Sequence, residues 1–252
     1  MTIDKNTETE FSEDFLLGGR VLVRQPTEGY RVTIDPIFLA ASIEIEPNDT
    51  ILDVGAGVGA ASLCLATRAL NVKVTGVELQ RDYVRYAAEN IKLNKLRERV
   101  EILHGDLLRP PPRLAAGTFS HVMTNPPYLD ATRNNISYNE TKAMANLEGE
   151  ADLDQWAKFS LLMVKPKGTV TFIHRADRLD QILSYFSGKL GNIIIYPLWP
   201  GRNKPAKRVL IRGVKNANGA LRLAPGMILH SDDGRYTPEA DAVLRQAKSI
   251  VM

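Results

Sequence analysis

The chain has 252 residues, 44% of them hydrophobic, with a formal net charge of +3; this length suits one α/β domain and is too short for two of ordinary size. No apolar run approaches the ~20 residues of a membrane span, and the polar, acidic start MTIDKNTETEFSED argues against a secretory or transit signal. We therefore expect a cytoplasmic protein with no membrane partner. We also expect no bound metal, because the single cysteine, Cys64, and the scattered histidines lack the spacing of ligands.

The first residues differ in pattern from the rest. Residues 1–14 have no periodic apolar signal, and we expect a disordered tail. From Phe15 the chain gives a glycine turn, a short alternating strand and a helix that begins at Asp35-Pro36, an acid followed by a proline. We interpret residues 15–48 as a strand and helix extension of a single domain that spans residues 15–252.

Strands and helices alternate after this extension. Helical stretches separate the first strands, which predicts right-handed crossovers and a parallel sheet covered on both faces. The last two strands are joined by the loop PGRNKPA, which is too short for a crossover helix, so they should pair antiparallel. The expected fold is α/β, a doubly wound and mostly parallel seven-stranded sheet with an antiparallel C-terminal hairpin. The strands are expected at residues 50–54, 72–78, 100–106, 121–125, 168–175, 192–199 and 207–215.

Glycines follow the first of these strands. The stretch ILDVGAGVGAASL contains Gly55, Gly57 and Gly59 between the strand and its helix. Glycine allows a sharp turn and a close approach of the backbone to a ligand, and the helix N-terminus offers unpaired N–H groups. The pattern predicts a cofactor at this loop, but alone it does not separate a dinucleotide from another adenosine-containing cofactor.

Three acids stand at strand ends, where the carboxyl ends of parallel strands line one crevice. Glu78 ends the second strand and is expected to accept the ribose hydroxyl protons, and Asp106 ends the third and can accept from an adenine amino group. Asp53 would lie near the other end of the cofactor. S-adenosylmethionine carries an ammonium and a sulfonium there, whereas a pyrophosphate would be repelled.

The fourth strand ends in TNPPY, where two prolines donate no backbone hydrogen bonds. The side-chain oxygen of Asn125, beside the cofactor crevice, and the carbonyl of Pro126 form two fixed acceptors, which suit a planar NH2 group. Holding both N–H bonds out of plane localises the nitrogen lone pair so that it can attack a methyl carbon. Tyr128 offers a ring on which a base can stack. These residues predict N-methylation of an exocyclic amine or an amide.

Two later segments have unusual composition. Residues 130–151 are polar and aperiodic, and a segment this long is expected to be a lid or binding loop. Between Asp180 and Asp232 there is no acidic residue, and we expect Lys204, Lys207 and Arg208 to contact RNA phosphates. The alternative is a solvated basic face.

With its DVGAGVG and NPPY motifs, the sequence resembles the S-adenosylmethionine-dependent methyltransferases that methylate amino groups, which have a Rossmann-like class I fold. More narrowly, it is similar to the bacterial adenine-N6-methyltransferases of valine tRNA. That likeness covers nearly the whole chain from Phe15, including QPTEGYRVTIDPIFLAA and YTPEADAVLRQA. The resemblance implies S-adenosyl-L-methionine as cofactor, contacts to it from Gln25, Arg31 and Thr33 as well as Asn125, and a tRNA adenine as acceptor.

Other acceptors and roles stay open. Protein glutamine N5-methyltransferases share the NPPY signature, but they carry a helical domain for which too few residues separate Phe15 from Asp53. A small-molecule O- or N-methyltransferase is possible if the basic stretch is only a solvated face. A non-catalytic RNA-binding subunit that retains the fold is the alternative from another class. The sequence does not set the oligomeric state.

Overall fold

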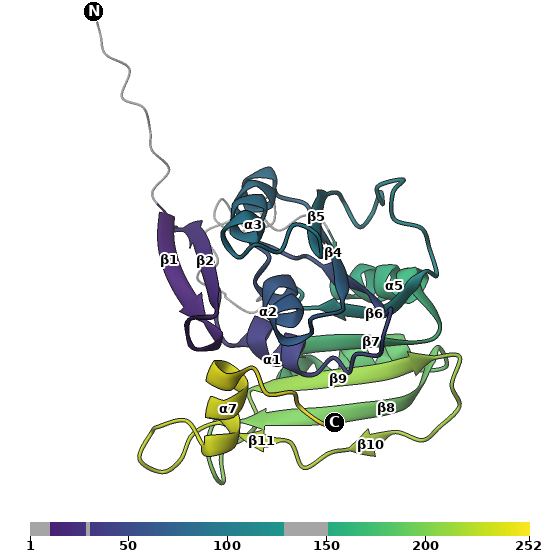
Figure 1. The fold of residues 1–252 in the computed structure, drawn as a ribbon. Coiled ribbons are helices and arrows are strands. Elements are labelled where there is room, and N and C mark those ends of the chain that lie inside the picture. The colour runs from purple at the N-terminus through teal and green to yellow at the C-terminus, as the bar shows by residue number, and fades with distance from the viewer. Residues whose placement is uncertain (1–10, 29–30, 129–150) are drawn as a thin grey trace, which may run out of the picture.

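The computed structural model describes residues 11–28, 31–128 and 151–252, and most of its strands form one large sheet (Figure 1). The sheet comprises β3 (Thr50–Val54), β4 (Lys73–Glu78), β5 (Val100–His104), β6 (Phe119–Thr124), β7 (Val164–Arg175), β8 (Leu190–Trp199), β9 (Arg208–Lys215), β10 (Arg222–Leu223) and β11 (Met227–Ile228). Neighbouring strands follow the order β10-β8-β9-β7-β6-β3-β4-β5, and β11 also pairs with β8. This is the doubly wound architecture that the sequence predicts.

The strands β3 to β7 are parallel wherever they pair, as predicted. Strand β3 pairs with β4 on one side and with β6 on the other, so the strand order reverses at β3. At such a reversal the loops after neighbouring strands diverge and leave a crevice at the carboxyl ends. The topology therefore predicts a ligand site beyond the ends of β3, β4 and β6.

The C-terminal part of the sheet is mixed. Strand β9 lies between β7 and β8 and is antiparallel to both, which confirms the predicted pairing of the last two long strands. All seven predicted strands are present. Strands β10 and β11 extend the sheet beyond them, parallel to β8. The sequence analysis missed these strands because two residues are too few to show an alternating pattern.

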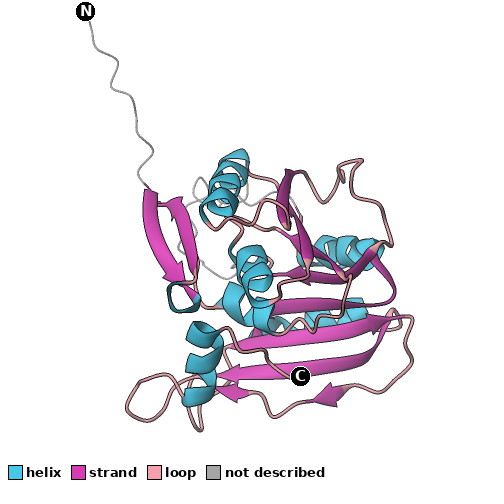
Figure 2. Cartoon of the chain, in the orientation of Figure 1, coloured by secondary structure: helices cyan, strands magenta, loops and turns pink. Residues whose placement is uncertain are grey.

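Helices cover both faces of the sheet (Figure 2). One apolar cluster includes residues of α1 (Asp35–Ala41), α2 (Ala60–Arg68), α3 (Arg81–Leu93) and α7 (Pro238–Gln246), and the other includes α5 (Leu153–Met163) and α6 (Leu179–Phe186). Neighbouring residues of β3 point to opposite faces, so Ile51 belongs to the first cluster and Leu52 to the second. Burial on both faces explains the continuous apolar runs of the strands. Within the described ranges, no helix is both long and apolar enough to cross a membrane.

An antiparallel hairpin of β1 (Phe11–Leu16) and β2 (Val21–Pro26) precedes α1. Residues 11–14, which the sequence analysis assigned to the tail, are part of β1, and Asp14 pairs with Val23. Half of the strand sequence FSEDFL is polar, its three polar residues are consecutive, and Phe15 is 67% exposed, so no alternating apolar pattern marked the strand. Residues 1–10 lie outside the described residues.

Two asparagines of the α3 segment attach this hairpin to the domain. Asn90 Oδ1 accepts from the Arg24 backbone N–H at 2.8 Å, and Asn90 Nδ2 donates to the Arg24 carbonyl at 2.9 Å. Asn94 pairs with the N–H and C=O of Leu22 in the same way, at 2.9 and 2.7 Å. Asn90 Nδ2 also donates to the carbonyl of Val58 in the glycine loop at 3.0 Å. Asn90 therefore links the hairpin to that loop.

Candidate active site

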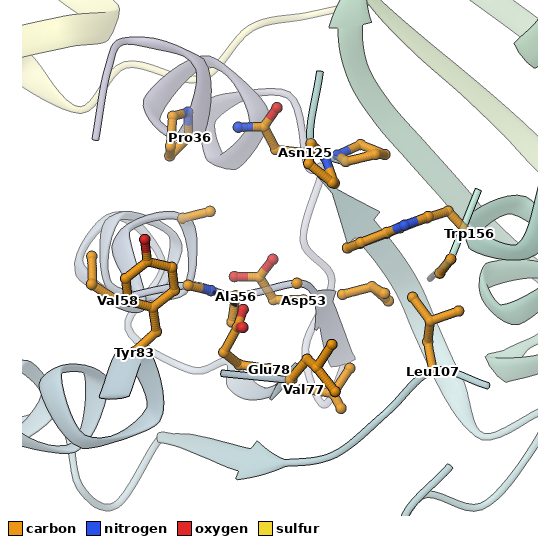
Figure 3. Close-up of a pocket in the computed structure, with 18 of the residues that line it drawn as sticks. Pro36, Asp53, Ala56, Val58, Val77, Glu78, Tyr83, Leu107, Asn125 and Trp156 are labelled. Carbon is orange, nitrogen blue, oxygen red and sulfur yellow. Dashed lines mark hydrogen bonds between the residues drawn. The ribbon is translucent and has the colours of Figure 1, made fainter. Parts of the chain in front are cut away.

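A cavity of about 550 Å³ opens at the carboxyl ends of β3, β4 and β6, where the strand order reverses (Figure 3). It combines the two motifs that the sequence analysis singled out. Eight of the predicted site residues line it: Asp53, Gly55, Gly57, Glu78, Asp106, Asn125, Pro126 and Tyr128. The predicted cofactor loop and the TNPPY turn therefore face one space.

The three predicted glycines have left-handed backbone conformations but different surroundings. A Cβ atom at Gly55, with φ +69°, would lie 2.3 Å from the ring of Trp156, so only glycine fits there. A Cβ at Gly57, with φ +55°, would meet nothing within 4 Å, so this backbone is open to a ligand. Gly59 precedes α2 with φ +87° and is not among the residues that line the cavity. It shapes the turn without facing the ligand space.

Glu78 ties the end of β4 to the glycine loop. Its Oε2 accepts from the backbone N–H of Gly57 and its Oε1 from that of Gln80, both at 2.8 Å. The side chain is largely buried, and this burial raises the pKa of Glu78 although the backbone hydrogen bonds act in the opposite sense. The carboxylate is thus held in a fixed orientation beside the cavity.

Asp53 is buried at the end of β3 and points into the same space as Glu78 (Figure 3). Its Oδ2 accepts from the hydroxyl of Ser62 at 2.7 Å. Burial raises the pKa of Asp53 to about 6; the Ser62 bond opposes this shift, and the charge of Glu78 adds to it. Two buried carboxyl groups on one wall favour a ligand that carries positive charge.

Asp106 lies at the rim of the cavity, after β5. Its Oδ1 accepts from the backbone N–H of Leu108 at 2.8 Å, which fixes the turn that follows the strand. Leu107 and Leu108 line the cavity next to it. A carboxylate beside two leucines suits a flat apolar ring with a polar edge, such as adenine.

The TNPPY turn forms the opposite wall. Asn125 directly follows β6, and its amide extends toward Pro36 at the start of α1, across the cavity from Asp53 (Figure 3). The hydroxyl of Tyr128 lies 3.0 Å from Asn125 Oδ1. The predicted acceptor oxygen therefore has a donor from the protein within reach, which the sequence did not indicate.

Tyr128 is held on several sides. Its hydroxyl donates to Oδ2 of Asp35 at 2.6 Å. The guanidinium of Arg208 lies over the ring, 4.6 Å from its centre, and the His174 ring meets it edge to face at 4.9 Å. Arg208 therefore covers one face of the Tyr128 ring.

The three early residues expected to contact the cofactor do not line the cavity. Gln25 is buried; its Oε1 accepts from the Val32 N–H at 2.8 Å, and its amide donates to Asp14. Arg31 forms an ion pair with Asp14 at 2.8 Å, and Thr33 Oγ1 accepts from the backbone N–H that begins α1, at 3.4 Å. These residues hold the segment that brings Val32 and Pro36 to the cavity wall, and their polar groups are used in that task.

The basic segment divides into two kinds of residue. Lys204 and Lys207 are exposed in the connection between β8 and β9. Arg208, expected to contact RNA phosphate, instead forms an ion pair with the buried carboxylate of Asp35, with Nε 2.9 Å from Oδ2. Arg212 likewise pairs with Glu44 at 3.0 Å. The stretch between Asp180 and Asp232, which has no acidic residue, therefore includes arginines that form ion pairs within the fold.

Sequence reasoning missed two cavity neighbours. Trp156 of α5 is 6% exposed and lines the cavity, and its Nε1 has no hydrogen-bond partner among the described residues. Asp35 was noted only as a helix start, yet it contacts Tyr128 and Arg208. Of the expected loop at residues 130–151, only Ala151 lies within the described residues, and it lines the cavity. Within those residues, no group of three His, Cys, Asp or Glu side chains is arranged to hold a metal ion.

The sequence agrees with this geometry at the level of the family. Residues 34–149 match the family model of the methyltransferase small domain, a range that includes both the glycine loop and the TNPPY turn. The chain is a methyltransferase. This match supports the resemblance drawn from the DVGAGVG and NPPY motifs.

Several curated relatives of this methyltransferase are named as RNA adenine methyltransferases. The tRNA1(Val) (adenine(37)-N6)-methyltransferase of Shewanella halifaxensis is 27% identical over 188 residues, which cover 73% of this chain and 75% of the relative. The protein of the same name from Haemophilus influenzae is 24% identical over 219 residues, or 85% and 90% of the two chains. An rRNA N(6)-adenosine-methyltransferase of Caenorhabditis elegans is 29% identical over 133 residues, which cover 53% of this chain and 55% of the relative.

Solved structures share the fold of the methyltransferase. A predicted O-methyltransferase from Agrobacterium tumefaciens superposes with a TM-score of 0.72 at 21% identity, covering 86% of this chain and 98% of that one. A geranyl diphosphate methyltransferase bound to sinefungin gives a TM-score of 0.51 at 15% identity, covering 70% and 76%. These likenesses confirm the predicted class I fold.

Proposed function

We propose that this methyltransferase transfers a methyl group from S-adenosylmethionine to the exocyclic N6 of an adenine in RNA, with tRNA as the preferred RNA. The observation that carries the proposal is the meeting, in one cavity, of the acid-lined glycine loop and the Asn125-Pro126 turn. The names of the relatives supply the acceptor class, since those from bacteria act on tRNA by name and that from Caenorhabditis elegans on rRNA.

The residues at the glycine loop fit S-adenosylmethionine. The open space at Gly57 admits a ligand against the backbone, and the buried Asp53 and Glu78 favour a cationic one. In this arrangement Glu78 would accept from the ribose hydroxyls, Asp106 from the adenine amino group, and Asp53 would face the positively charged end. When bound, the cofactor supplies an electrophilic methyl carbon.

The TNPPY turn would receive the acceptor base. An exocyclic amine is a poor nucleophile because its lone pair is delocalised into the ring. Asn125 Oδ1 and the Pro126 carbonyl can accept its two N–H protons and hold the nitrogen in a reactive orientation. The nitrogen becomes acidic as it gains a new bond, so its proton can pass to water and no strong base is needed. The target base leaves its stack to enter, and the ring of Tyr128 is our candidate for its stacking surface.

The connection between β8 and β9 is our candidate for RNA phosphate contact. Lys204 and Lys207 are exposed there, and the same segment ends at Arg208, which contacts Tyr128. Cations this close in sequence to Arg208, which contacts the turn through Tyr128, can neutralise phosphates that flank the target nucleotide. This role is proposed for the two lysines and not for Arg208, whose charge is paired with Asp35.

The test is to incubate the protein with methyl-labelled S-adenosylmethionine and separate pools of undermodified tRNA, ribosomal RNA, a peptide release factor and small metabolites. We expect label in tRNA, recovered as N6-methyladenosine after digestion. Asn125→Ala should bind cofactor almost normally and lower turnover by about a hundredfold or more, whereas Asn218→Ala, at an exposed position, serves as the matched control. Label in the protein or metabolite pool, or in none, would refute the proposal.

A further inference from the structure

Arg208 lies at the edge of the sheet that carries the TNPPY turn. It is the first residue of β9 and directly follows the exposed Lys207, which ends the connection from β8. Across the sheet it is paired with Arg175, the last residue of β7. Strands β6 and β7 are parallel, so the end of β7 lies at the same edge as the turn that follows β6. The side chain of Arg208 can therefore reach that turn.

The guanidinium of Arg208 is anchored to a buried carboxylate. Its Nε lies 2.9 Å from Oδ2 of Asp35, the first residue of α1, and the Asp35 side chain is only 4% exposed. Water competes little for an ion pair at such a site, so the interaction is stronger than one at the surface. A guanidinium is planar and rigid, so a bond at Nε restricts the orientation of the whole group.

The same guanidinium lies over the ring of Tyr128. Its central carbon is 4.6 Å from the ring centre, within the range of about 6 Å over which a cation is attracted to an aromatic face. The imidazole of His174 meets the ring edge to face at 4.9 Å. Burial lowers the pKa of His174 to about 4, and the charges of Arg178 and Arg208 act in the same sense, so this imidazole is neutral at pH 7. Tyr128 thus has a cation at its face and a neutral ring at its edge.

We propose that Arg208 is a positioning residue for methyl transfer: its guanidinium, anchored by Asp35, fixes the ring of Tyr128 in the orientation that the acceptor base needs. The inference rests on the proposed function for its catalytic consequence. A ring that tilts away from the base loses stacking, and the amine then spends less time in line with the methyl carbon. This role differs from the phosphate contact that the basic stretch of the sequence suggested.

Steady-state kinetics with two variants of Arg208 test the inference. Arg208→Met keeps the length of the side chain but removes its charge and donors, so kcat should fall by about tenfold to a hundredfold, with the Kd for S-adenosylhomocysteine within about twofold of wild type. Arg208→Lys retains a cation for both Asp35 and the ring, and it should lose less.

Arg212→Met is the matched control. Arg212 lies in the same strand, is only 9% exposed and forms an ion pair with Glu44 at 3.0 Å. Its substitution removes a similar ion pair four residues farther along β9, and kcat should stay within about threefold of wild type. Equal losses of kcat in the two methionine variants would overturn the proposal.

Two measurements separate positioning from other uses of the charge. Asp35→Asn/Arg208→Met removes both members of the ion pair and should stay at least about tenfold slower than wild type; restored turnover would mean that Arg208 only neutralises Asp35, and the proposal would fail. In RNA binding by Arg208→Met, the slope of log K against log salt should equal that of wild type. A slope reduced by about 1 would assign Arg208 to an RNA phosphate and would also overturn the proposal.

The position of the ring can be measured without RNA. In protein with ¹³C-labelled tyrosine rings, the Tyr128 signals are identified by their loss in Tyr128→Phe. Arg208→Met removes a cation that lies 4.6 Å from the ring centre, so it should shift these signals, whereas Arg212→Met should not. Unchanged Tyr128 signals in Arg208→Met would refute the inference. If no RNA is methylated, the proposed function fails, and this readout still decides whether Arg208 fixes the ring.

Discussion

Replacing Asn90 by alanine should weaken both the fold and cofactor binding. The change leaves three backbone groups without partners, the N–H and C=O of Arg24 and the C=O of Val58. Each buried unsatisfied group costs about 1–3 kcal/mol, and relaxation toward water at the hairpin lowers the sum, so we expect a loss of about 2–3 kcal/mol in the free energy of unfolding. For a chain of this size that lowers Tm by roughly 5 to 10 °C.

Asn94→Ala is the matched control. Asn94 pairs with Leu22 as Asn90 pairs with Arg24, but no contact joins it to the glycine loop. Urea unfolding should show that this variant has a free energy of unfolding about 1–2 kcal/mol lower than that of wild type. Calorimetric titration with S-adenosylhomocysteine should show affinity reduced about tenfold in Asn90→Ala, because this variant loses the hydrogen bond to the glycine loop. Asn94→Ala should bind with nearly unchanged affinity. Equal affinities in the two variants would refute the link between hairpin and loop.

Three further predictions concern the cavity and its rim. The pKa of Asp53 is about 6 in the ligand-free protein, and the ammonium group of S-adenosylhomocysteine prefers the ionised carboxylate. Calorimetry should therefore find that affinity for S-adenosylhomocysteine falls by up to about tenfold per pH unit below pH 6 and is level above pH 7, with a weaker pH dependence in Asp53→Asn. Lys204→Ala/Lys207→Ala should weaken RNA binding in filter assays and reduce the slope of log K against log salt by about 1–2. In thermal unfolding, Gly55→Ala should lower the free energy of unfolding by about 2–4 kcal/mol, because its Cβ would lie 2.3 Å from the indole of Trp156. Gly117 is the control: it has a similar φ of +70° and its Cβ would meet nothing within 4 Å, so Gly117→Ala should lower the free energy of unfolding by about 1 kcal/mol.

Each of these has a result that would contradict it. A pH dependence identical in wild type and Asp53→Asn would assign the titration to another group. The control for the lysine pair is Lys73→Ala/Lys189→Ala, which changes two exposed residues at the opposite edge of the sheet; the same loss of RNA affinity in both pairs would mean a general charge effect. Equal stability of the two glycine variants would show that the indole moves aside.

The long elements and the acids and glycines on the cavity wall were predictable from the sequence because their signals are local. A buried parallel strand has a continuous apolar run, and the position of Asp53 or Glu78 at a strand end fixes the edge of the sheet at which it emerges. Strand β1, which is half polar, and the two-residue strands lack such a run. The sequence therefore indicated the residues at strand ends better than the elements at the margins.

The partners of site residues were not predictable in the same way. Asp35 and Arg208 are separated by 173 positions, and no local pattern links them. Gln25, Arg31 and Thr33 lie beside the correct segment, but one sequence cannot tell a residue that lines a cavity from one that braces it, because that depends on where Asp14 pairs across the hairpin. Trp156 reaches the cavity only because α5 packs next to the glycine loop.

The insertion of β9 between β7 and β8 has a consequence for synthesis on the ribosome. The strands that carry the glycine loop and its acids are complete once β6 has emerged, whereas β9, the last long strand, must enter between two strands that are already made. Pairing of this kind awaits the final quarter of the chain, since domains are built from the N-terminus onward. A nascent chain would therefore hold the predicted cofactor loop before Arg208 arrives to contact Tyr128. Under the proposed function, we expect premature termination near the C-terminus to leave a protein that binds cofactor and methylates poorly.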